Sequence, residues 1–384
     1  MPLNKNKKFY YPWRDNNAFQ LLVDGENYFS RIFNLIDEAS HYIIIEQYLI
    51  ESGNIVTRLT DHLINAAQRN VTVLLLFDAY GSLNLNKNDR DRLNKKNIHL
   101  IFYNPLHLRN GYKNLIRNHR KFFCVDNYIA LTGGAGFTDE FDTKNNSNGW
   151  HDVMLQISGP VLNDWLNSFT DIWLPYAALP VKLMPDTLSQ ITKENIAGRL
   201  VISNSPQHQE ISRSLINQIQ HSQDAVWLAT PYFIATRKLR RELKYAALRG
   251  VDVRLLLPNT HSDHPWVTYA YRNYYHKLLR SGVRIFEYQT RFLHAKLIIC
   301  DDWISIGSSN LDRWNRRWST DTNQEIKSIV FSEKIMRFFE NDFSQSHEII
   351  ADEWKRRSWS QRLKEVLCQK IVFLLDMIGS TYRK

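Results

Sequence analysis

Two stretches decide how this sequence is read: NHRKFFCVD at residues 118–126 and LHAKLIICD at residues 293–301. Each holds a histidine, a lysine two residues later and an aspartate five residues after the lysine, with four apolar residues in between. The motif residues are His119, Lys121 and Asp126 in the first stretch and His294, Lys296 and Asp301 in the second. A lone His-x-Lys has little meaning, but two copies with the same spacing indicate a duplicated functional unit.

The spacing places each histidine beside its lysine. Residues two apart on a strand point to the same face, so each stretch presents an imidazole next to an ammonium group. Asp126 and Asp301 lie five residues after the lysines, so on a continuous strand their side chains would point to the opposite face. We therefore expect these aspartates to be structural members of the site, paired with a buried or backbone donor.

The two halves of the chain also repeat one another outside these stretches. AAQRNVTVLLLF (66–77) matches AALRGVDVRLLL (246–257), and both read as the end of a helix followed by a buried strand. Runs rich in β-branched and aromatic residues flank them, at 43–50, 97–105, 226–234 and 282–289. This alternation predicts an α/β protein in which each half has a mixed, mostly parallel sheet flanked by helices.

The region from Leu179 to Pro185 follows a helix-like stretch and precedes the second repeat. We expect a first domain over residues 1–180, a second over 181–350, and a basic amphipathic segment over 351–384.

Composition narrows the class of protein. Forty-nine Lys and Arg against 39 Asp and Glu give a formal net charge of +10. Such a charge favours binding to nucleic acid or to anionic lipid, and the alternative is that it only keeps the protein soluble. Three widely separated cysteines form neither a disulfide framework nor a zinc site, which favours a reducing compartment. The N-terminal residues lack the apolar region of a signal peptide, which suggests the cytoplasmic side.

Further candidate site residues follow each motif. The small-residue turns TGGAGF (132–137) and IGSSNL (306–311) would let backbone amides approach phosphate oxygens. Asp152 and Glu325 supply one carboxylate per half. A carboxylate bonded to one imidazole nitrogen fixes the tautomer and leaves the other nitrogen for chemistry. The alternative is that both are surface charges at strand starts.

These motifs resemble those of the phospholipase D superfamily. Within it, the chain is similar to bacterial cardiolipin synthases that lack N-terminal transmembrane helices. The resemblance runs over roughly residues 18–345 and is carried by WHDVMLQISGPVLND, by LATPYFIATRKLRRELKYAALRGVDVRLLLPN and by FLHAKLIICDDWISIGSSNLDRWN. The TPYF stretch is the most family-like part, whereas the paired His-Lys motif is common to the superfamily.

The resemblance implies a pseudo-twofold pair of domains whose motifs meet in one cleft. It implies that one motif histidine attacks the phosphodiester phosphorus while the other protonates the departing alcohol and deprotonates the incoming one. Of the two possible assignments, we favour His119 as the nucleophile and His294 as the acid and base. Lys121 and Lys296 would neutralise the nonbridging oxygens, with Ser308 and Asn310 as further donors. No metal or other cofactor is implied, because the lysines supply the positive charge.

One position departs from the family pattern. Gly136 stands where the family usually has the asparagine that Asn310 provides in the second half. Either backbone amides of the first half substitute for it, or the site has lost transition-state stabilisation of about 3 kcal/mol.

Two segments suit an anionic membrane surface. The stretch 106–122 places Arg109, Lys113, Arg117 and Arg120 among leucines, and residues 354–384 combine tryptophans and cations with the apolar run IVFLL. That run is too short to span a bilayer, but it suits the interface plane. The alternatives are a solvated loop for the first segment and a terminal helix docked on its own domain for the second.

The resemblance thus implies a peripheral enzyme that forms cardiolipin from phosphatidylglycerol and a second phospholipid through a phosphohistidine. The same site with water as acceptor would be a phospholipase D hydrolase. A nuclease-type phosphodiesterase is a further alternative, although nuclease members often carry one motif per chain, and we expect no nucleic-acid partner. The last alternative, motivated by Gly136, is a binding or scaffold protein on a decayed site.

Overall fold

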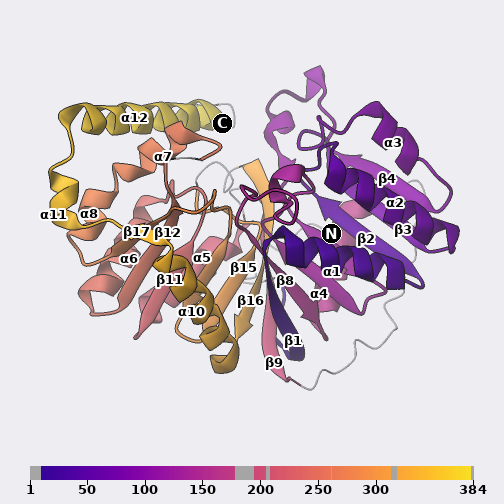
Figure 1. Ribbon diagram of the computed structural model, residues 1–384, viewed down its shortest axis with the longest axis horizontal. Helices are drawn as coiled ribbons and strands as arrows, with labels where there is room; N and C mark the ends of the chain where they lie inside the picture. Colours follow the sequence, from indigo (N-terminus) through magenta and orange to yellow (C-terminus); the bar gives the residue numbers. More distant parts are fainter. Residues whose placement is uncertain (1–9, 178–193, 205–207, 261, 313–317, 382–384) are drawn as a thin grey trace.

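The computed structural model describes residues 10–177, 194–204, 208–260, 262–312 and 318–381. Its two halves lie side by side, each with a sheet and its own helices (Figure 1). The strands of the first half are β1 (Arg14–Val23), β2 (Tyr42–Gln47), β3 (Thr72–Asp78), β4 (Ile98–Tyr103), β5 (Arg117–Asn118), β6 (Phe122–Val125), β7 (Ile129–Gly133) and β8 (Val153–Ser158).

The strands of the second half follow the same plan. They are β9 (Ile196–Asn204), β10 (His208–Gln209), β11 (Ala225–Ala229), β12 (Asp252–Pro258), β13 (Arg284–Tyr288), β14 (Leu297–Cys300), β15 (Trp303–Gly307), β16 (Ser319–Lys327) and β17 (Ser346–Glu348). The pairings give the order β4-β3-β2-β6-β7-β8-β1 in the first half and β13-β12-β11-β14-β15-β16-β9 in the second. The two orders correspond strand for strand, so the duplication predicted from the sequence is a duplication of topology.

The sheets are mixed, as predicted, but their parallel part is smaller than predicted. Only β2, β3 and β4 are parallel to one another in the first half, and β11, β12 and β13 in the second. The motif strands β6 and β14 run antiparallel to both of their neighbours. The physical reason is the short link after each motif, because a connection of three residues such as Asp126–Tyr128 can join only antiparallel strands.

Helices cover both faces of each sheet, which explains why the central strands are continuous apolar runs. Ile43 and Ile45 of β2 pack with α1 and α2, whereas Ile44 between them belongs to the core shared with α4. The helices are α1 (Asp24–Glu38), α2 (Asn54–Gln68), α3 (Lys87–Leu93), α4 (Leu162–Trp173), α5 (Glu210–His221), α6 (Arg237–Leu248), α7 (Pro265–Arg272), α8 (Tyr275–Leu279), α10 (Ile329–Ser344), α11 (Ala351–Lys355) and α12 (Trp359–Thr381), with short 3-10 segments η1 (Leu108–Leu115) and η2 (Asp139–Phe141).

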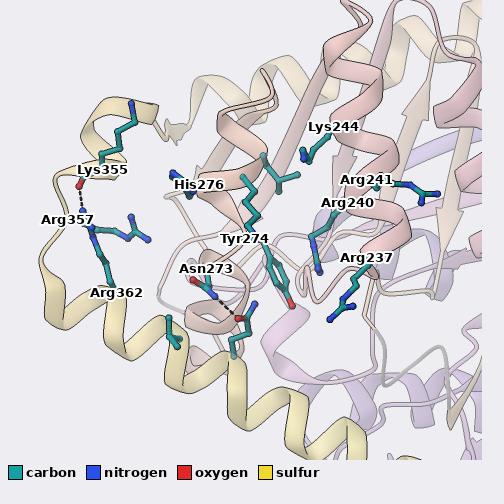
Figure 2. Close-up of a pocket in the computed structure, with 14 residues that line it drawn as sticks. Arg237, Arg240, Arg241, Lys244, Asn273, Tyr274, His276, Lys355, Arg357 and Arg362 are labelled. Atoms are coloured by element: carbon teal, nitrogen blue, oxygen red, sulfur yellow. Dashed lines mark hydrogen bonds between the residues drawn. The ribbon is translucent and has the colours of Figure 1, made fainter.

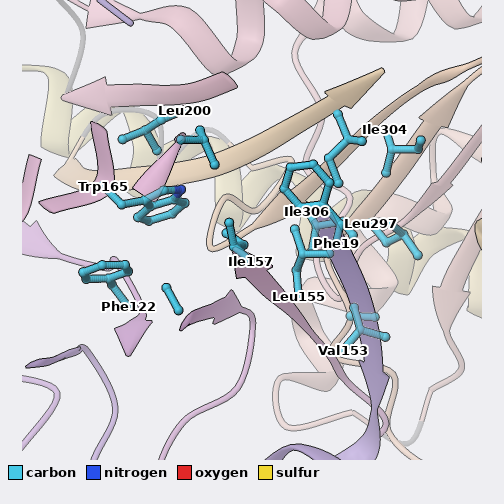
Figure 3. Packing of buried hydrophobic residues seen from close by; sticks show 14 of the residues in the cluster. Phe19, Phe122, Val153, Leu155, Ile157, Trp165, Leu200, Leu297, Ile304 and Ile306 are labelled. Carbon is cyan, nitrogen blue, oxygen red and sulfur yellow. The ribbon is translucent and has the colours of Figure 1, made fainter. Parts of the chain in front are cut away.

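One hydrophobic core crosses from the first half to the second. Phe19, Leu155 and Ile157 of β1 and β8 pack in the same cluster as Leu297 and Ile306 of β14 and β15 (Figure 3). Residues 18–23 of β1 pair with β8, and Arg14 and Asn17 near its start pair with β9, so the two sheets are joined edge to edge. The two halves therefore share both a strand pairing and a hydrophobic core.

The C-terminal segment forms α11 and α12, and α12 packs on α7. Asn273 donates a hydrogen bond to Gln369 at 2.6 Å, and Cys368 and Val372 contact the core of the second half. The segment is thus a helix docked on its own domain, while its outer face remains exposed. The domain boundary that we predict at residues 180/181 lies outside the described residues.

Candidate active site

The first motif reaches across to the second half of the chain. Arg117 and Asn118 form β5, which pairs with the start of β16, and the backbone N–H of His119 donates to the carbonyl of Thr320 at 3.0 Å. This pairing brings the His119 imidazole to Asp321, with 2.8 Å between Nδ1 and Oδ1. The hydroxyl of Ser308 donates to the same carboxylate oxygen, also at 2.8 Å.

The second motif makes the reciprocal contact. Leu293 bridges to His151, and the N–H of His294 donates to the carbonyl of His151 at 2.8 Å. The Nδ1 atom of His294 lies 2.7 Å from Oδ2 of Asp152. Each motif histidine is therefore held at Nδ1 by a carboxylate from the other half. The Nε2 atom of His294 lies 3.2 Å from Nζ of Lys296.

The structure corrects the prediction that Glu325 bonds to a motif histidine. Glu325 is buried, but it pairs with Arg199, whose Nε lies 3.1 Å from its Oε2, and not with a motif histidine. Strand register explains why: Gly133 pairs with Met154 in the first half and Gly307 with Asn323 in the second, so Asp321 occupies the place of Asp152. Glu325 lies four residues, about 13 Å, further along β16.

The motif aspartates accept backbone hydrogen bonds, which is the pairing that strand parity predicts. Asp126 accepts from the N–H groups of residues 40–42 at 2.7 to 2.9 Å, and Asp301 from those of residues 223–225 at 2.9 to 3.0 Å. Both aspartates tie the turn after the motif strand to the start of a neighbouring central strand. They lie away from the imidazoles and position the motifs.

Both motif histidines line a single cavity of about 580 Å³. Aromatic rings surround them: Tyr48 lies 4.9 Å from His119, and Trp150 and Phe141 lie 5.2 and 5.3 Å from His294, measured between ring centroids. The rest of the lining comes from both halves, namely Leu49, Arg117, Lys121, Gly134, Gly136, Tyr232, Ile234, Asp263, His264, Trp266, Val267, Asn310, Asp312, Ser319 and Val372. Its mixture of apolar walls and cationic groups suits a phosphodiester that carries lipid chains.

The imidazoles are neutral at physiological pH. Burial, helped by Lys121, lowers the pKa of His119 to about 4, although Asp321 works against this. Burial and the charge of Lys296 hold the pKa of His294 well below its usual value. When neutral His119 donates its Nδ1–H to Asp321, its Nε2 keeps a lone pair, which is the state that a nucleophile requires.

The two partner carboxylates differ from one another. Burial raises the pKa of Asp152 to about 7 despite nearby Lys296. Burial also acts to raise the pKa of Asp321, but His119, Ser308 and Lys121 outweigh it and the pKa lies below its ordinary value. The His294–Asp152 pair can thus hold a proton near neutral pH, whereas Asp321 stays ionised.

The motif lysines are buried beside their histidines. Lys121 Nζ donates to the carbonyl of His119 at 2.8 Å, and Lys296 Nζ donates to that of His294 at 2.7 Å. Burial and the mutual repulsion of the two ammonium groups lower the pKa of Lys121 to about 7, and burial lowers that of Lys296 to about 8. A phosphodiester between them would relieve this repulsion.

These lysine pKa values predict the pH dependence of turnover. Because both pKa values are depressed, the free protein loses its phosphate-binding charges as the pH rises through about 7 to 8. We expect kcat/KM for a phosphodiester to fall across this range, and kcat to fall only at higher pH, since bound phosphate raises the lysine pKa values. A rate profile from pH 5.5 to 10 measures both, and a flat kcat/KM above pH 8 would contradict the assignment.

The turns after the motif hairpins differ between the halves. Asn310 is buried, lines the cavity and leaves its Oδ1 without a hydrogen-bond partner among the described residues. Gly134 and Gly136 stand at the places of Ser308 and Asn310. A Cβ on Gly136 would lie 3.0 Å from the carbonyl oxygen of Leu49, and a Cβ on Gly134 would lie 2.6 Å from the Asp152 carboxylate. The first half has thus closed the space that a side-chain donor would need.

This asymmetry leaves Asn310 as the single asparagine donor of the two turns. We expect Asn310→Ala to lower kcat by about 10²-fold, the loss seen when one oxyanion donor is removed. Gly136→Asn should not restore it in that background, because Leu49 crowds the position. Turnover of the two variants measures this, and full activity of Asn310→Ala would show that backbone amides carry the stabilisation.

Two functional features were missed by sequence reasoning. The sequence contains one weak indication of Asp321: a tryptophan shortly precedes the aspartate in both halves. Trp150 precedes Asp152 by two residues, and Trp318 precedes Asp321 by three. The other feature is an ionic clamp between the halves: His151 Nδ1 lies 2.7 Å from Asp24, and its Nε2 lies 2.9 Å from Asp342 of α10. No spacing in the sequence links these three residues.

The fold and the site together define a phospholipase D-type protein, with two topologically equivalent halves and the motif histidine of each half in one cavity. The family described as "Cardiolipin synthase, PLD-like domain" matches residues 32–173 and 215–347. The chain is 32% identical over 352 residues to cardiolipin synthase 2 of Bacillus cereus, covering 90% of this chain and 68% of that protein. It is 30% identical over 370 residues to the cardiolipin synthase of Oceanobacillus iheyensis, covering 96% and 77%. The chain belongs to this cardiolipin synthase, phospholipase D-like family.

A solved structure has the same fold. The phosphatidylserine synthase of Haemophilus influenzae superimposes with a TM-score of 0.72 at 15% identity, covering 94% of this chain and 95% of that one. Within the described part of the chain, none of the helices combines the length and apolar character needed to cross a membrane.

Proposed function

We propose that the chain is a cardiolipin synthase that transfers a phosphatidyl group from phosphatidylglycerol to a hydroxyl group of a second phospholipid. The observation that carries this proposal is the pair of imidazoles in one cavity, each bonded through Nδ1 to a carboxylate of the other half. The cardiolipin synthases similar over most of the chain support the choice of substrate.

The reaction we propose has two displacements at phosphorus. Nε2 of His119 attacks the phosphorus and forms a P–N bond, the P–O bond to glycerol breaks, and the His294–Asp152 pair gives its proton to the departing oxygen. In the second step the same pair takes the proton from the incoming hydroxyl, whose oxygen forms the new P–O bond as the P–N bond breaks. Lys121, Lys296 and Asn310 stabilise the negative charge on the nonbridging oxygens in both steps.

The assignment of His119 as nucleophile rests on the difference between the carboxylates. Asp321 is held ionised by His119 and Ser308, so it can stabilise the positive charge that His119 gains when it is phosphorylated. Asp152, whose pKa is about 7, helps His294 to hold a proton before it is delivered. Each histidine thus has the partner that its role requires.

We further propose that the protein works as a peripheral protein on the cytoplasmic side of an anionic membrane, with no nucleic acid as partner. The lipid substrates require contact with a bilayer, and the net charge of +10 favours an anionic one. Leu106 and Leu108, beside the cations of η1, are exposed and could contribute to this contact.

The test is turnover of phosphatidylglycerol vesicles by the purified protein, with products read by lipid mass spectrometry. We expect cardiolipin and free glycerol, with and without EDTA, because Lys121 and Lys296 supply the charge at the phosphate. Phosphatidic acid without cardiolipin would show a hydrolase in place of the transferase. No turnover of any phospholipid would refute the proposal.

A further inference from the structure

A second, larger hollow lies on the second half, away from the motifs. It is a groove of about 1020 Å³ between α6 on one side and α11 and α12 on the other (Figure 2). Eight lysine and arginine side chains line it: Arg237, Arg240, Arg241, Lys244, Lys277, Lys355, Arg357 and Arg362. It shares no lining residue with the catalytic cavity.

Four of these cations come from one face of α6. Residues 237, 240, 241 and 244 have the spacing i, i+3, i+4, i+7, which places them side by side along the helix, as Figure 2 shows. Like charges at these spacings repel one another. Opposite them, Lys355, Arg357 and Arg362 add further positive charge, so the groove has the electrostatics of a polyanion site.

Carboxylates of the chain neutralise only part of this charge. Glu242 pairs with Arg241 at 2.9 Å, Asp352 with Lys355 at 2.9 Å, and Glu365 with Arg357 at 3.0 Å. By contrast, Arg237, Lys244 and Lys277 form no ion pair with a carboxylate of the described residues. The rest of the lining is partly apolar and partly polar: Asn273, Tyr274, His276, Leu278, Val366 and Gln369. The groove therefore presents cations above a partly apolar floor.

An exposed apolar stripe runs along α12 beside the groove. Its residues recur every three or four positions and are about half exposed or more: Trp359, Leu363, Leu367, Ile371 and Leu374. Glu365 and Cys368, about half a turn away, face the body of the protein. The groove residues Arg362 and Val366 lie between these two faces, so the groove opens along the flank of the stripe.

We propose that this groove binds the phosphates of anionic phospholipids and that, with the apolar stripe of α12, it docks the chain on a bilayer. An amphipathic helix with cations beside its apolar face is the arrangement that lies in a membrane interface. A nucleic acid would explain the cations, but it has no apolar phase to cover the stripe. Val372 of α12 lines the catalytic cavity, so docking through α12 brings that cavity to the lipid surface.

The experiment is flotation of the full chain with vesicles of phosphatidylcholine alone or with 30 mol% phosphatidylglycerol, in low and high salt. The groove variant Arg237→Gln/Lys244→Gln/Lys277→Gln removes one arginine and two lysines that form no ion pair within the described part of the chain. Its control, Lys327→Gln/Lys334→Gln/Arg337→Gln, removes the same residue types around the start of α10. We expect at least a ten-fold loss of binding to anionic vesicles for the groove variant and less than a two-fold loss for the control.

The stripe has its own variant and control. Leu363→Gln/Leu367→Gln should weaken binding to vesicles of both compositions, whereas Ile329→Gln/Val330→Gln, which alters two exposed apolar residues of α10, should not. Circular dichroism confirms that each variant folds. Equal binding of anionic vesicles by the groove variant and its control would overturn the proposal. So would a groove variant that loses binding to an oligonucleotide but still binds vesicles as wild type does.

This inference does not depend on the catalytic proposal. Turnover of a monomeric short-chain phosphatidylglycerol, which needs no bilayer, should stay within two-fold of wild type in the groove variant. A wild-type chain that floats with anionic vesicles but turns over no lipid would refute the proposed reaction and leave the docking site standing. An equal loss of turnover on the monomeric lipid would instead place the groove in the catalytic machinery and overturn the docking role.

Discussion

His119→Ala is expected to abolish formation of a phosphoenzyme, whereas His294→Ala should preserve it when the leaving group needs no proton. His119 has the ionised Asp321 behind its Nδ1, and its Nε2 is the attacking atom in the proposed reaction. His294 contributes a proton. This proton transfer raises the reaction rate by about 10²- to 10⁴-fold when the leaving group is an alkoxide, but by little when it is a nitrophenolate. Both variants should lose nearly all turnover of phosphatidylglycerol.

The measurement is a rapid-mixing burst with a nitrophenyl phosphodiester, followed by peptide mass spectrometry. His294→Ala should release a burst of nitrophenolate and carry the added phosphoryl group on the peptide that contains His119. The control is Asp321→Asn, which keeps the shape of the dyad but removes its charge and should slow the burst. A modified peptide containing His294 in the His119→Ala variant would reverse the two roles.

A second large effect is expected at the clamp between the halves. His151 is buried, bonded to Asp24 at 2.7 Å and to the fully buried Asp342 at 2.9 Å, and stacked between Tyr288 and Phe338. His151→Ala would leave the carboxylate of Asp342 buried without its partner. Breaking one side of a buried ion pair costs about 3–5 kcal/mol, so we expect a loss of that size in the free energy of unfolding.

The clamp also predicts how stability depends on pH. Burial alone would lower the pKa of His151, but the hydrogen bonds that its ring donates to Asp24 and Asp342 raise the pKa to about 9 in the folded chain. An unfolded histidine titrates near pH ~6.5. The stabilisation is therefore complete below about pH 6.5 and is lost as the pH rises through about 9. Arg291, bonded to Asp24 at 2.6 Å, stays charged throughout and keeps part of the contact.

Urea unfolding at pH 6, 7.5 and 9 measures both effects. The matched control is His62→Ala, which removes a pair with Asp37 at the same 2.7 Å but at the surface, where about 1 kcal/mol or less is at stake. His151→Ala should cut the pH dependence and His62→Ala should not. Equal losses in the two variants would show that burial of the clamp contributes nothing.

The sequence was sufficient to locate the duplicated strands because apolar runs and their spacing depend on local geometry. The run at 43–50 overlaps β2 (Tyr42–Gln47), the run at 97–105 contains β4, and both motif histidines line one cavity. The mostly parallel sheet was an overestimate, since strand direction around the motif hairpins is set by turn length and not by apolar pattern. The boundary at 180/181 and the catalytic roles remain predictions.

Pairing across the halves was beyond sequence reasoning for a physical reason. Asp152 and Glu325 were chosen by their place after each motif, but the register of β16 against β15 decides which carboxylate reaches a histidine. A carboxylate four residues along a strand looks equivalent in sequence and is about 13 Å away in space. Only the pairing of β5 with β16 shows that His119 belongs with Asp321.

The reciprocal exchange of carboxylates, with His119 bonded to Asp321 and His294 to Asp152, bears on how such a chain can evolve. After a gene duplication, each half that relies on the other for its acid partner no longer forms a complete pair within itself. A fragment of one half, expressed alone as a monomer, would hold a histidine and a carboxylate that do not pair. Consider two inactive full-length chains, one with a damaged first half and the other with a damaged second half. They could restore an active site only if the intact half of one molecule packed against the intact half of the other.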